Sequence, residues 1–280
     1  MIQDIFPAVF SNHYEALTPS AEDRAVVFRE GRLLIRYDEE NARLHFPPCG
    51  AFAPAGSAVY LFSVNRDRFF LIRDAIGVPV PAGYAWYTLQ EVRRWKRRCN
   101  PDAFAAFTAY HLWKWYEESR FCGACGARTE IDSQERAMVC PACGRKIYPR
   151  INPAVIVGVI NGEKLLLTRY NTGYAHNALV AGFAEIGETL EETVQREVME
   201  EVGLRVKNIR YYKSQPWGVA ADLLAGFFCE VDGDDRIRRD EHELKYASWV
   251  ERQKIELQPT DDSLTNEMMR MFQEGRIRAL

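Results

Sequence analysis

Two β-hairpins are predicted in the first third of the chain, because apolar runs alternate there with short polar turns. The first hairpin turns at Glu30-Gly31, and the second turns at Asn65-Arg66-Asp67. The apolar runs are residues 25–28, 32–35, 58–62 and 68–72. A helix is predicted from Asn100-Pro101 to Glu118, since proline is favoured in the first helical turn. We therefore expect a mainly β N-terminal domain over residues 1–118.

A second set of apolar runs follows Asn152, and Asn161-Gly162 within it is the dipeptide most favoured in tight hairpin turns. The predicted elements are strands over residues 154–160, 165–167, 206–213 and 221–231 and a final helix over residues 264–273. Strands flanked by helices on this scale predict an α/β (α+β) sandwich with a mixed sheet. We assign this domain to residues 150–280.

Local signals between Gly182 and Leu204 define a loop followed by a helix. Thr189 and Glu192 form a capping box, so the helix should begin there, and Gly203 is the residue expected to end it. One flank of the helix is apolar at four-residue spacing, which would anchor it to a core. The apolar residues are Leu190, Val194, Val198 and Val202.

Three carboxylates, Glu197, Glu200 and Glu201, cluster on the neighbouring flank of this helix. Their mutual repulsion destabilises an isolated helix, and Mg²⁺ or Mn²⁺ would relieve it while also binding phosphate oxygens. The alternative is a solvated acidic face. With Gly182 in the preceding loop, where the backbone can approach a ligand closely, the pattern favours a metal site for phosphate chemistry.

Four of the seven cysteines form two Cys-x2-Cys pairs separated by fourteen residues. This spacing is typical of a zinc ribbon, and four protein ligands leave no open position for substrate, so one structural Zn²⁺ is expected. The ligands are Cys122, Cys125, Cys140 and Cys143. The alternative is a pair of disulfides, which a cytoplasmic location disfavours. We assign the ribbon to residues 119–149.

Composition and charge exclude several other classes of protein. The formal net charge of −3 argues against a broad basic surface for nonspecific binding to nucleic acid. The one dense basic run, residues 93–98, is predicted to be a solvated helix face or turn, with an RNA-contacting patch as the alternative. Residues 1–10 lack a secretion-signal pattern, and no apolar run is long enough to cross a bilayer. A cytoplasmic protein without membrane contact is expected.

The segment after Ala181 also fills every fixed position of the Nudix box: Gly182-x5-Glu188-x7-Arg196-Glu197-Val198-x-Glu200-Glu201-x-Gly203-Leu204. The chain therefore resembles the Nudix hydrolases, which cleave nucleoside diphosphates linked to another group. The preceding ribbon and the later Ser214-Gln215-Pro216-Trp217 are similar to the NADH pyrophosphatase branch. The next residues, 218–222, depart from the pattern of that branch.

The resemblance implies a catalytic metal site. Two or three Mg²⁺ or Mn²⁺ ions are expected to be bound by the Ala181 carbonyl, Glu197, Glu201 and Glu243. The ions would neutralise a pyrophosphate and lower the pKa of a water molecule. Glu200 is the expected base, with Glu185 or Glu243 as alternatives.

The resemblance also implies substrate contacts. These are expected from Tyr148, Gln215, Pro216 and Trp217. Packing of the ribbon is the alternative role for Tyr148. Glu185 is expected to pair with Arg196 and brace the site.

The implied reaction converts NADH or NAD⁺ and water into AMP and nicotinamide mononucleotide. Removal of NAD caps from RNA 5′ ends uses the same bond and is the nearest alternative. ADP-ribose and dinucleoside polyphosphates are other possible substrates. A nucleotide-binding regulator is the alternative outside the enzymes, although such regulators tend to lose carboxylates that this chain keeps. The resemblance further implies a homodimer.

Overall fold

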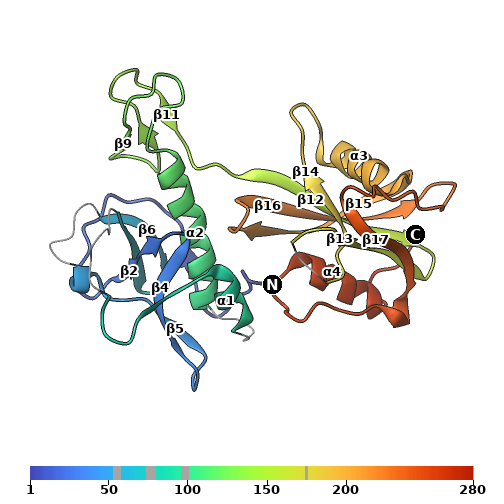
Figure 1. The fold of residues 1–280 in the computed structure, drawn as a ribbon, viewed down its shortest axis with the longest axis horizontal. Helices are drawn as coiled ribbons and strands as arrows, with labels where there is room; N and C mark the ends of the chain where they lie inside the picture. Colours follow the sequence, from blue (N-terminus) through green and yellow to red (C-terminus); the bar gives the residue numbers. More distant parts are fainter. Residues whose placement is uncertain (53–57, 74–79, 96–100, 174–175, 280) are drawn as a thin grey trace. The chain divides into compact units, whose positions relative to one another are not determined.

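The computed structural model describes residues 1–52, 58–73, 80–95, 101–173 and 176–279 (Figure 1). The chain forms two compact units. The C-terminal unit comprises Met1, Ile151–Trp217 and Asp222–Leu280, and the N-terminal unit comprises Ile2–Arg150 and Gly218–Ala221. A further division of the N-terminal unit at residues 118 and 119 stays a prediction.

A six-stranded mixed sheet forms the centre of the C-terminal unit. Its strands are β12 (Asn152–Asn161), β13 (Lys164–Tyr170), β14 (Val180–Phe183), β15 (Val206–Trp217), β16 (Asp222–Val231) and β17 (Leu244–Glu251). The strand order is β15-β16-β12-β13-β17, and β14 pairs with β12 outside this path. Strands β12 and β16 run parallel, whereas the other neighbours are antiparallel.

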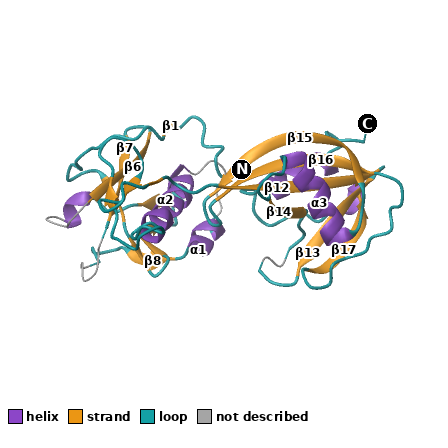
Figure 2. Ribbon diagram, turned by 90° about the horizontal axis from the view of Figure 1, so that it is seen from above, coloured by secondary structure: helices purple, strands orange, loops and turns teal. Residues whose placement is uncertain are grey.

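One helix covers each face of this sheet: α3 (Leu190–Val202) lies on one side and α4 (Leu264–Gln273) on the other (Figures 1 and 2). The two cores follow from the alternation of side chains along β12. Val155, Val157 and Val159 pack in the core with α3, whereas Ile156 and Ile160 pack in the core with α4. The predicted α/β sandwich with a mixed sheet is confirmed.

Helix α3 begins and ends where its sequence predicts. The Thr189 side chain accepts a hydrogen bond from the Glu192 backbone, and the Glu192 carboxylate accepts one from the Thr189 backbone. Gly203 ends the helix with a φ of 66°, a left-handed conformation that glycine adopts at little cost. Val194, Val198 and Val202 are fully buried, so the predicted apolar stripe is confirmed.

Two strands of the sheet, β14 and β17, were not predicted. Strand β14 is four residues long and contains a glycine, so it lacks an extended apolar run. In β17, polar and charged residues interrupt the apolar positions. Pairing with β12 and β13 respectively, rather than local pattern, forms these strands. A short 3-10 helix, η2 (Arg252–Lys254), follows β17.

The N-terminal unit contains two four-stranded sheets. Their strands are β1 (Phe10–Ser11), β2 (Arg24–Val26), β3 (Phe28–Arg29), β4 (Arg32–Asp38), β5 (Arg43–His45), β6 (Ala58–Val64), β7 (Asp67–Ile72) and β8 (Ala85–Tyr87). One sheet has the order β1-β6-β7-β2, and in the other β4 pairs with β3, β5 and β8. The second predicted hairpin is confirmed as β6–β7. The first is confirmed at its turn, as β3–β4, whereas β2, which begins the same apolar run, pairs in parallel with β7. A 3-10 helix, η1 (Cys49–Phe52), lies between β5 and β6.

Two helices complete this part of the unit. Helix α2 (Pro101–Glu118) buries Phe104, Phe107 and Trp115. Helix α1 (Leu89–Arg94) contains the first residues of the basic run, and Trp95 stacks on Tyr37 with ring centroids 4.1 Å apart. Residues 96–98 of that run lie outside the described residues.

Among the described helices, none combines the length and apolar character needed to span a membrane.

The ribbon is a small three-stranded sheet within the N-terminal unit. Its strands are β9 (Glu130–Ile131), β10 (Met138–Val139) and β11 (Lys146–Ile147), in the order β11-β10-β9. Each cysteine pair closes a tight turn, in which the Cys122 amide donates to the Ala127 carbonyl and the Cys140 amide donates to the Arg145 carbonyl. This backbone brings both pairs of cysteines to one end of the ribbon.

Candidate functional site

Glu201 is the most deeply buried of the α3 carboxylates, with 1% of its surface exposed. The Tyr170 hydroxyl, at the end of β13, donates to its Oε1 at 3.2 Å, and the Ala181 amide in β14 donates to Oε1 at 3.4 Å. No basic side chain in the described ranges forms an ion pair with Glu201. A buried carboxylate without a cation is costly unless a metal ion or proton compensates its charge.

The cost of burying these carboxylates appears as raised pKa values. Burial, reinforced by the nearby charges of Glu243 and Glu197, raises the pKa of Glu201 to about 8, although hydrogen bonds from Ala181 and Tyr170 oppose the shift. Burial also raises the pKa of Glu197, with the charges of Glu200 and Glu243 contributing. Glu243, in the segment before β17, therefore shares one electrostatic environment with Glu197 and Glu201.

The carboxylate of Glu197 lies directly against the backbone of Gly182 in β14. A Cβ atom added to Gly182 would lie 2.0 Å from Cδ and from Oε1 of Glu197, well inside van der Waals contact. Gly182 is needed because its missing side chain leaves the space that Glu197 occupies. This close approach explains, in physical terms, the glycine that opens the sequence pattern.

Arg196 holds the polar edge of α3 together. Its guanidinium donates to Glu188 at 2.6 and 3.0 Å, to Glu197 at 2.8 Å, to Glu200 at 3.0 Å and to the Phe183 carbonyl at 2.8 Å. These bonds lower the pKa of Glu188 to about 2. The expected pairing of Arg196 with Glu185 is wrong, because Glu188 takes that position. Both glutamates lie in the loop before α3, and sequence distance alone could not separate them.

The donor set suits hard divalent cations. Carboxylate oxygens of Glu197, Glu201 and Glu243, together with the Ala181 carbonyl, are the oxygen ligands that Mg²⁺ and Mn²⁺ prefer. The Tyr170 hydroxyl lies 3.5 Å from the Ala181 oxygen as well as contacting Glu201, so it links two of the expected ligands. Tyr170 was not predicted, because no local motif distinguishes it from other strand residues that pack into the sheet.

Gln215, expected to contact substrate, is completely buried in β15. It donates to the Asp262 carbonyl at 2.8 Å and accepts from the Leu264 amide at 2.7 Å, which fastens the first turn of α4. The expectation that its side chain faces substrate is therefore corrected to a structural role. Its neighbour Pro216 is exposed and Trp217 is half-buried.

Tyr148 lies in the other unit, directly after β11, and 55% of it is exposed. Its hydroxyl donates to Glu135 at 3.1 Å, and the Glu135 carboxylate also contacts Lys146 at 2.5 Å. The ring is thus oriented by the ribbon while most of it stays accessible to a ligand. A role in substrate binding stays a prediction.

The four ribbon cysteines have the geometry of a zinc site. Three Sγ–Sγ separations, Cys122 to Cys143, Cys125 to Cys140 and Cys125 to Cys143, are 3.7, 3.5 and 3.7 Å. A tetrahedral site with Zn–S bonds of about 2.3 Å has sulfurs about 3.8 Å apart. Backbone amides lower the pKa of Cys122 and of Cys140, whereas hydrogen bonds from neighbouring thiols raise the pKa of Cys125 and of Cys143, so the four sulfurs share protons that a zinc ion would replace. The prediction of a structural zinc site is confirmed.

Two parts of the chain match known protein families. Residues 150–272 match the NUDIX domain family, and residues 117–148 match the NADH pyrophosphatase zinc ribbon domain. The chain is 33% identical over 255 residues to the NAD-capped RNA hydrolase NudC of Chromobacterium violaceum, which covers 90% of this chain and 92% of that protein. It is 34% identical over 216 residues to a protein of the same name from Stutzerimonas stutzeri, with 76% of each chain covered.

Solved structures support the fold. A crystal structure of a NUDIX hydrolase from Nitrosomonas europaea superimposes with a TM-score of 0.50 at 22% sequence identity. The match covers 56% of this chain and 92% of that one. At this level of identity the similarity concerns the arrangement of helices and strands alone.

Proposed function

Because the chain belongs to the Nudix hydrolases that carry an NADH pyrophosphatase zinc ribbon, we propose that it hydrolyses the pyrophosphate bond of NAD(H). The products are AMP and nicotinamide mononucleotide. The observation that carries the proposal is Glu201, a carboxylate with 1% exposure, whose pKa is raised by burial and by the charges of Glu243 and Glu197, and which has no basic partner among the described residues. Such a site is completed by a divalent cation, and a pyrophosphate is a natural further ligand of that cation.

Each residue of the site has a part in this reaction. Glu197, Glu201, Glu243 and the Ala181 carbonyl would hold the two or three Mg²⁺ or Mn²⁺ ions. When bound, these ions neutralise the pyrophosphate and acidify water. Glu200, which is 59% exposed and held by Arg196 at 3.0 Å, takes the proton from the attacking water. The water oxygen bonds to one phosphorus, the bond from that phosphorus to the bridging oxygen breaks, and the other phosphate leaves with the bridging oxygen.

NAD-capped RNA is the second candidate substrate. Its cap contains the same pyrophosphate, so the same carboxylates would release nicotinamide mononucleotide and an RNA with a 5′-monophosphate. The support is that both relatives described above are named for this activity, and one of them aligns with 90% of the chain. Free and RNA-linked NAD are therefore two substrates of one site.

A substrate panel tests the proposal. The purified chain is assayed with Mg²⁺ or Mn²⁺ on NADH, NAD⁺, ADP-ribose, a dinucleoside polyphosphate and NAD-capped RNA, and the products are identified by mass. We expect cleavage of NAD(H) and of the cap. Glu201→Gln should lower both activities by orders of magnitude with the fold intact, whereas Glu191→Gln, exposed on the same helix, should not. Preferred cleavage of ADP-ribose, or binding without cleavage, would contradict the proposal.

Location and assembly complete the proposed function. We propose that the chain acts in the cytoplasm. Cysteines at metal spacing, rather than in disulfides, support a reducing compartment. We also propose that it acts as a homodimer. Sedimentation velocity of the purified chain at micromolar concentration tests the assembly, and a single monomeric species would contradict it.

A further inference from the structure

Tyr170, the last residue of β13, has an apolar ring in the core and a hydroxyl among the expected metal ligands. Side chains alternate along β13, so Leu166 packs in the core with α3, whereas Leu165 and Leu167 pack in the core with α4. Tyr170 lies four residues after Leu166 and therefore on the α3 side, where its ring packs against the same core. Packing of the ring fixes the position from which the hydroxyl acts.

The hydrogen bonds of Glu201 differ between its two carboxylate oxygens. Oε1 accepts from the Tyr170 hydroxyl at 3.2 Å and from the Ala181 amide at 3.4 Å. Oε2 has one contact among the described residues, the longer one to Tyr170 at 3.4 Å. Each carboxylate oxygen can accept about two hydrogen bonds, so Oε1 is saturated and Oε2 keeps a lone pair for another ligand.

The Tyr170 hydroxyl has a single proton to donate. The carbonyl oxygens of Leu179 and Ala181 each lie 3.5 Å from it, farther than either oxygen of Glu201. A charged acceptor forms the stronger hydrogen bond, so the proton goes to Glu201. Tyr170 therefore leaves the Ala181 carbonyl, itself an expected metal ligand, without a competing donor from this hydroxyl.

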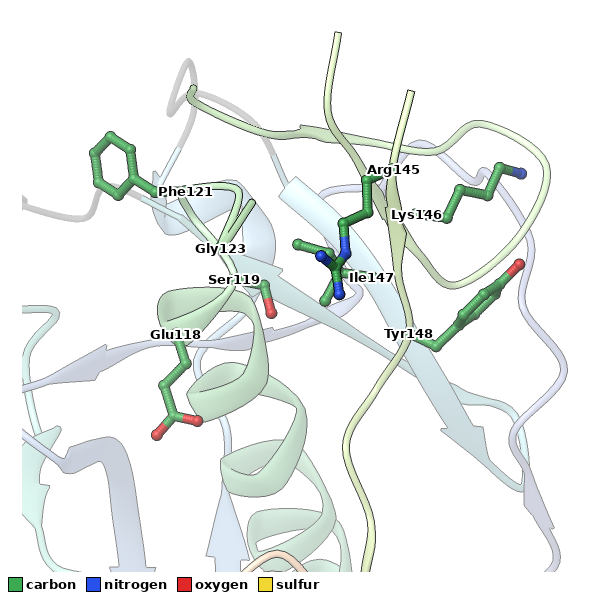
Figure 3. Close-up of a pocket in the computed structure, with 8 residues that line it drawn as sticks. All are labelled: Glu118, Ser119, Phe121, Gly123, Arg145, Lys146, Ile147 and Tyr148. Atoms are coloured by element: carbon green, nitrogen blue, oxygen red, sulfur yellow. The ribbon is translucent and has the colours of Figure 1, made fainter. Parts of the chain in front are cut away.

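A second tyrosine–glutamate pair, in the ribbon, has the cation that the first pair lacks. The Tyr148 hydroxyl donates to the half-buried Glu135 at 3.1 Å, and Lys146 lies 2.5 Å from the same carboxylate oxygen. The Lys146 and Tyr148 side chains extend to the same side of the chain in Figure 3. The pair of Tyr170 and Glu201 is more deeply buried and has no basic side chain among the described residues, so the charge of its carboxylate is left for a metal ion.

We propose that Tyr170 is a positioning residue of the metal site, whose hydroxyl holds Glu201 so that Oε2 is left for a divalent cation. The inference rests on the metal site of the proposed function and adds a residue that acts through Glu201, not on the substrate. Hydrogen bonds to a metal-binding carboxylate of this kind change metal affinity by about 10–100-fold.

Binding of Mn²⁺ to the zinc-loaded full-length protein, without substrate, tests the proposal. Free Mn²⁺ is measured by electron paramagnetic resonance during a titration. Tyr170→Phe keeps the packed ring and removes the hydroxyl, so it should raise the apparent Kd by about 10–100-fold at a nearly unchanged melting temperature. Glu201→Gln, which removes a ligand, should weaken binding further.

Thr168→Val is the matched control. Thr168 lies two residues before Tyr170 on the same side of β13, and its buried hydroxyl has no hydrogen-bond partner in the part of the chain that the structure describes. Removing this hydroxyl should leave the affinity for Mn²⁺ at the wild-type value. An equal loss of affinity in Thr168→Val and Tyr170→Phe would overturn the specific role of Tyr170.

Turnover of NADH at two concentrations of Mn²⁺ separates a positioning role from a role in the reaction. Tyr170→Phe should be slow at limiting Mn²⁺, and saturating Mn²⁺ should restore most of kcat. Equal affinity of wild type and Tyr170→Phe for Mn²⁺, or a loss of kcat that saturating Mn²⁺ does not restore, would overturn the proposal.

The binding experiment also distinguishes this proposal from the proposed function. Wild-type Mn²⁺ affinity in Glu201→Gln would overturn the metal site itself and the role of Tyr170 with it. The expected order of affinities in a protein that does not cleave NADH would support Tyr170 as a positioning residue and overturn the proposed reaction alone.

Discussion

The carboxylate of Glu197 occupies the space that a side chain at Gly182 would fill, 2.0 Å from the position of the missing Cβ atom. Gly182→Ala should therefore push Glu197 away from Glu201 without disturbing the core, because the clash is with the end of a side chain. A displacement of this size in a catalytic site costs roughly 100-fold in turnover. The measurement is kcat for NADH at saturating Mg²⁺, with a melting curve recorded alongside.

Gly123→Ala is the matched control for that prediction. A Cβ on Gly123 meets nothing within 4 Å, and its φ is not positive. The control should keep wild-type turnover of NADH. Wild-type turnover in Gly182→Ala as well would show that the position of Glu197 does not limit catalysis.

Arg196 and Glu188 should make stability depend on pH in the acid range. The pKa of Glu188 is lowered from 4.5 to about 2, chiefly by Arg196, so its ionised form stabilises the fold fully above pH 4.5. This contribution is lost as pH falls through the folded-state pKa. Glu188→Gln should thus lower the free energy of unfolding at pH 7, and the difference from wild type should shrink between pH 4.5 and pH 2. Urea denaturation at several pH values measures it.

Glu185→Gln is the control for the pH experiment, because Glu185 lies in the same loop and forms no ion pair among the described residues. It should change stability little at any pH. A larger effect of Glu185→Gln than of Glu188→Gln would restore the pairing that the sequence suggested.

Removing the structural zinc should affect stability, whereas removing the catalytic Mg²⁺ or Mn²⁺ should affect activity. Removing zinc, or Cys140→Ser, should lower the melting temperature and loosen the ribbon, because the four thiolates would lose the ion that holds them together. Removing Mg²⁺ or Mn²⁺ should stop catalysis and leave circular dichroism near 222 nm unchanged. Zinc content by atomic absorption and melting curves check this. Cys49→Ala, a buried thiol outside the ribbon, should keep one zinc per chain.

Helix α3 could be predicted residue by residue, because its signals are local. The capping box at Thr189 and the glycine at position 203 determine its ends, and the valine spacing determines its buried face. The zinc ligands were predictable for the same reason, since each pair of cysteines lies within one turn. Such features are determined by residues that are close together in the sequence.

Features that depend on distant contacts could not be read from the sequence. Tyr170 meets Glu201 across 31 positions of sequence. Strand β17 is polar enough to resemble a loop, and its pairing with β13 forms it. The arginine partner is Glu188 instead of Glu185 because the loop turns back on itself, with the Glu185 amide donating to the Glu188 carboxylate at 3.1 Å. In all three cases, contacts between residues that the local sequence pattern does not connect determine the structure.

Gln215 shows most directly how packing can change the role expected of a residue. Its amide group bonds both the Asp262 carbonyl and the Leu264 amide with no exposure to solvent. Gln215→Ala would leave these groups unpaired and should cost about 1–3 kcal/mol of stability. At this chain length that corresponds to a melting temperature lower by roughly 2–10 °C, with KM for NADH nearly unchanged below the transition. An increase in KM at an unaltered melting temperature would return Gln215 to the substrate site, so both quantities must be measured on one preparation.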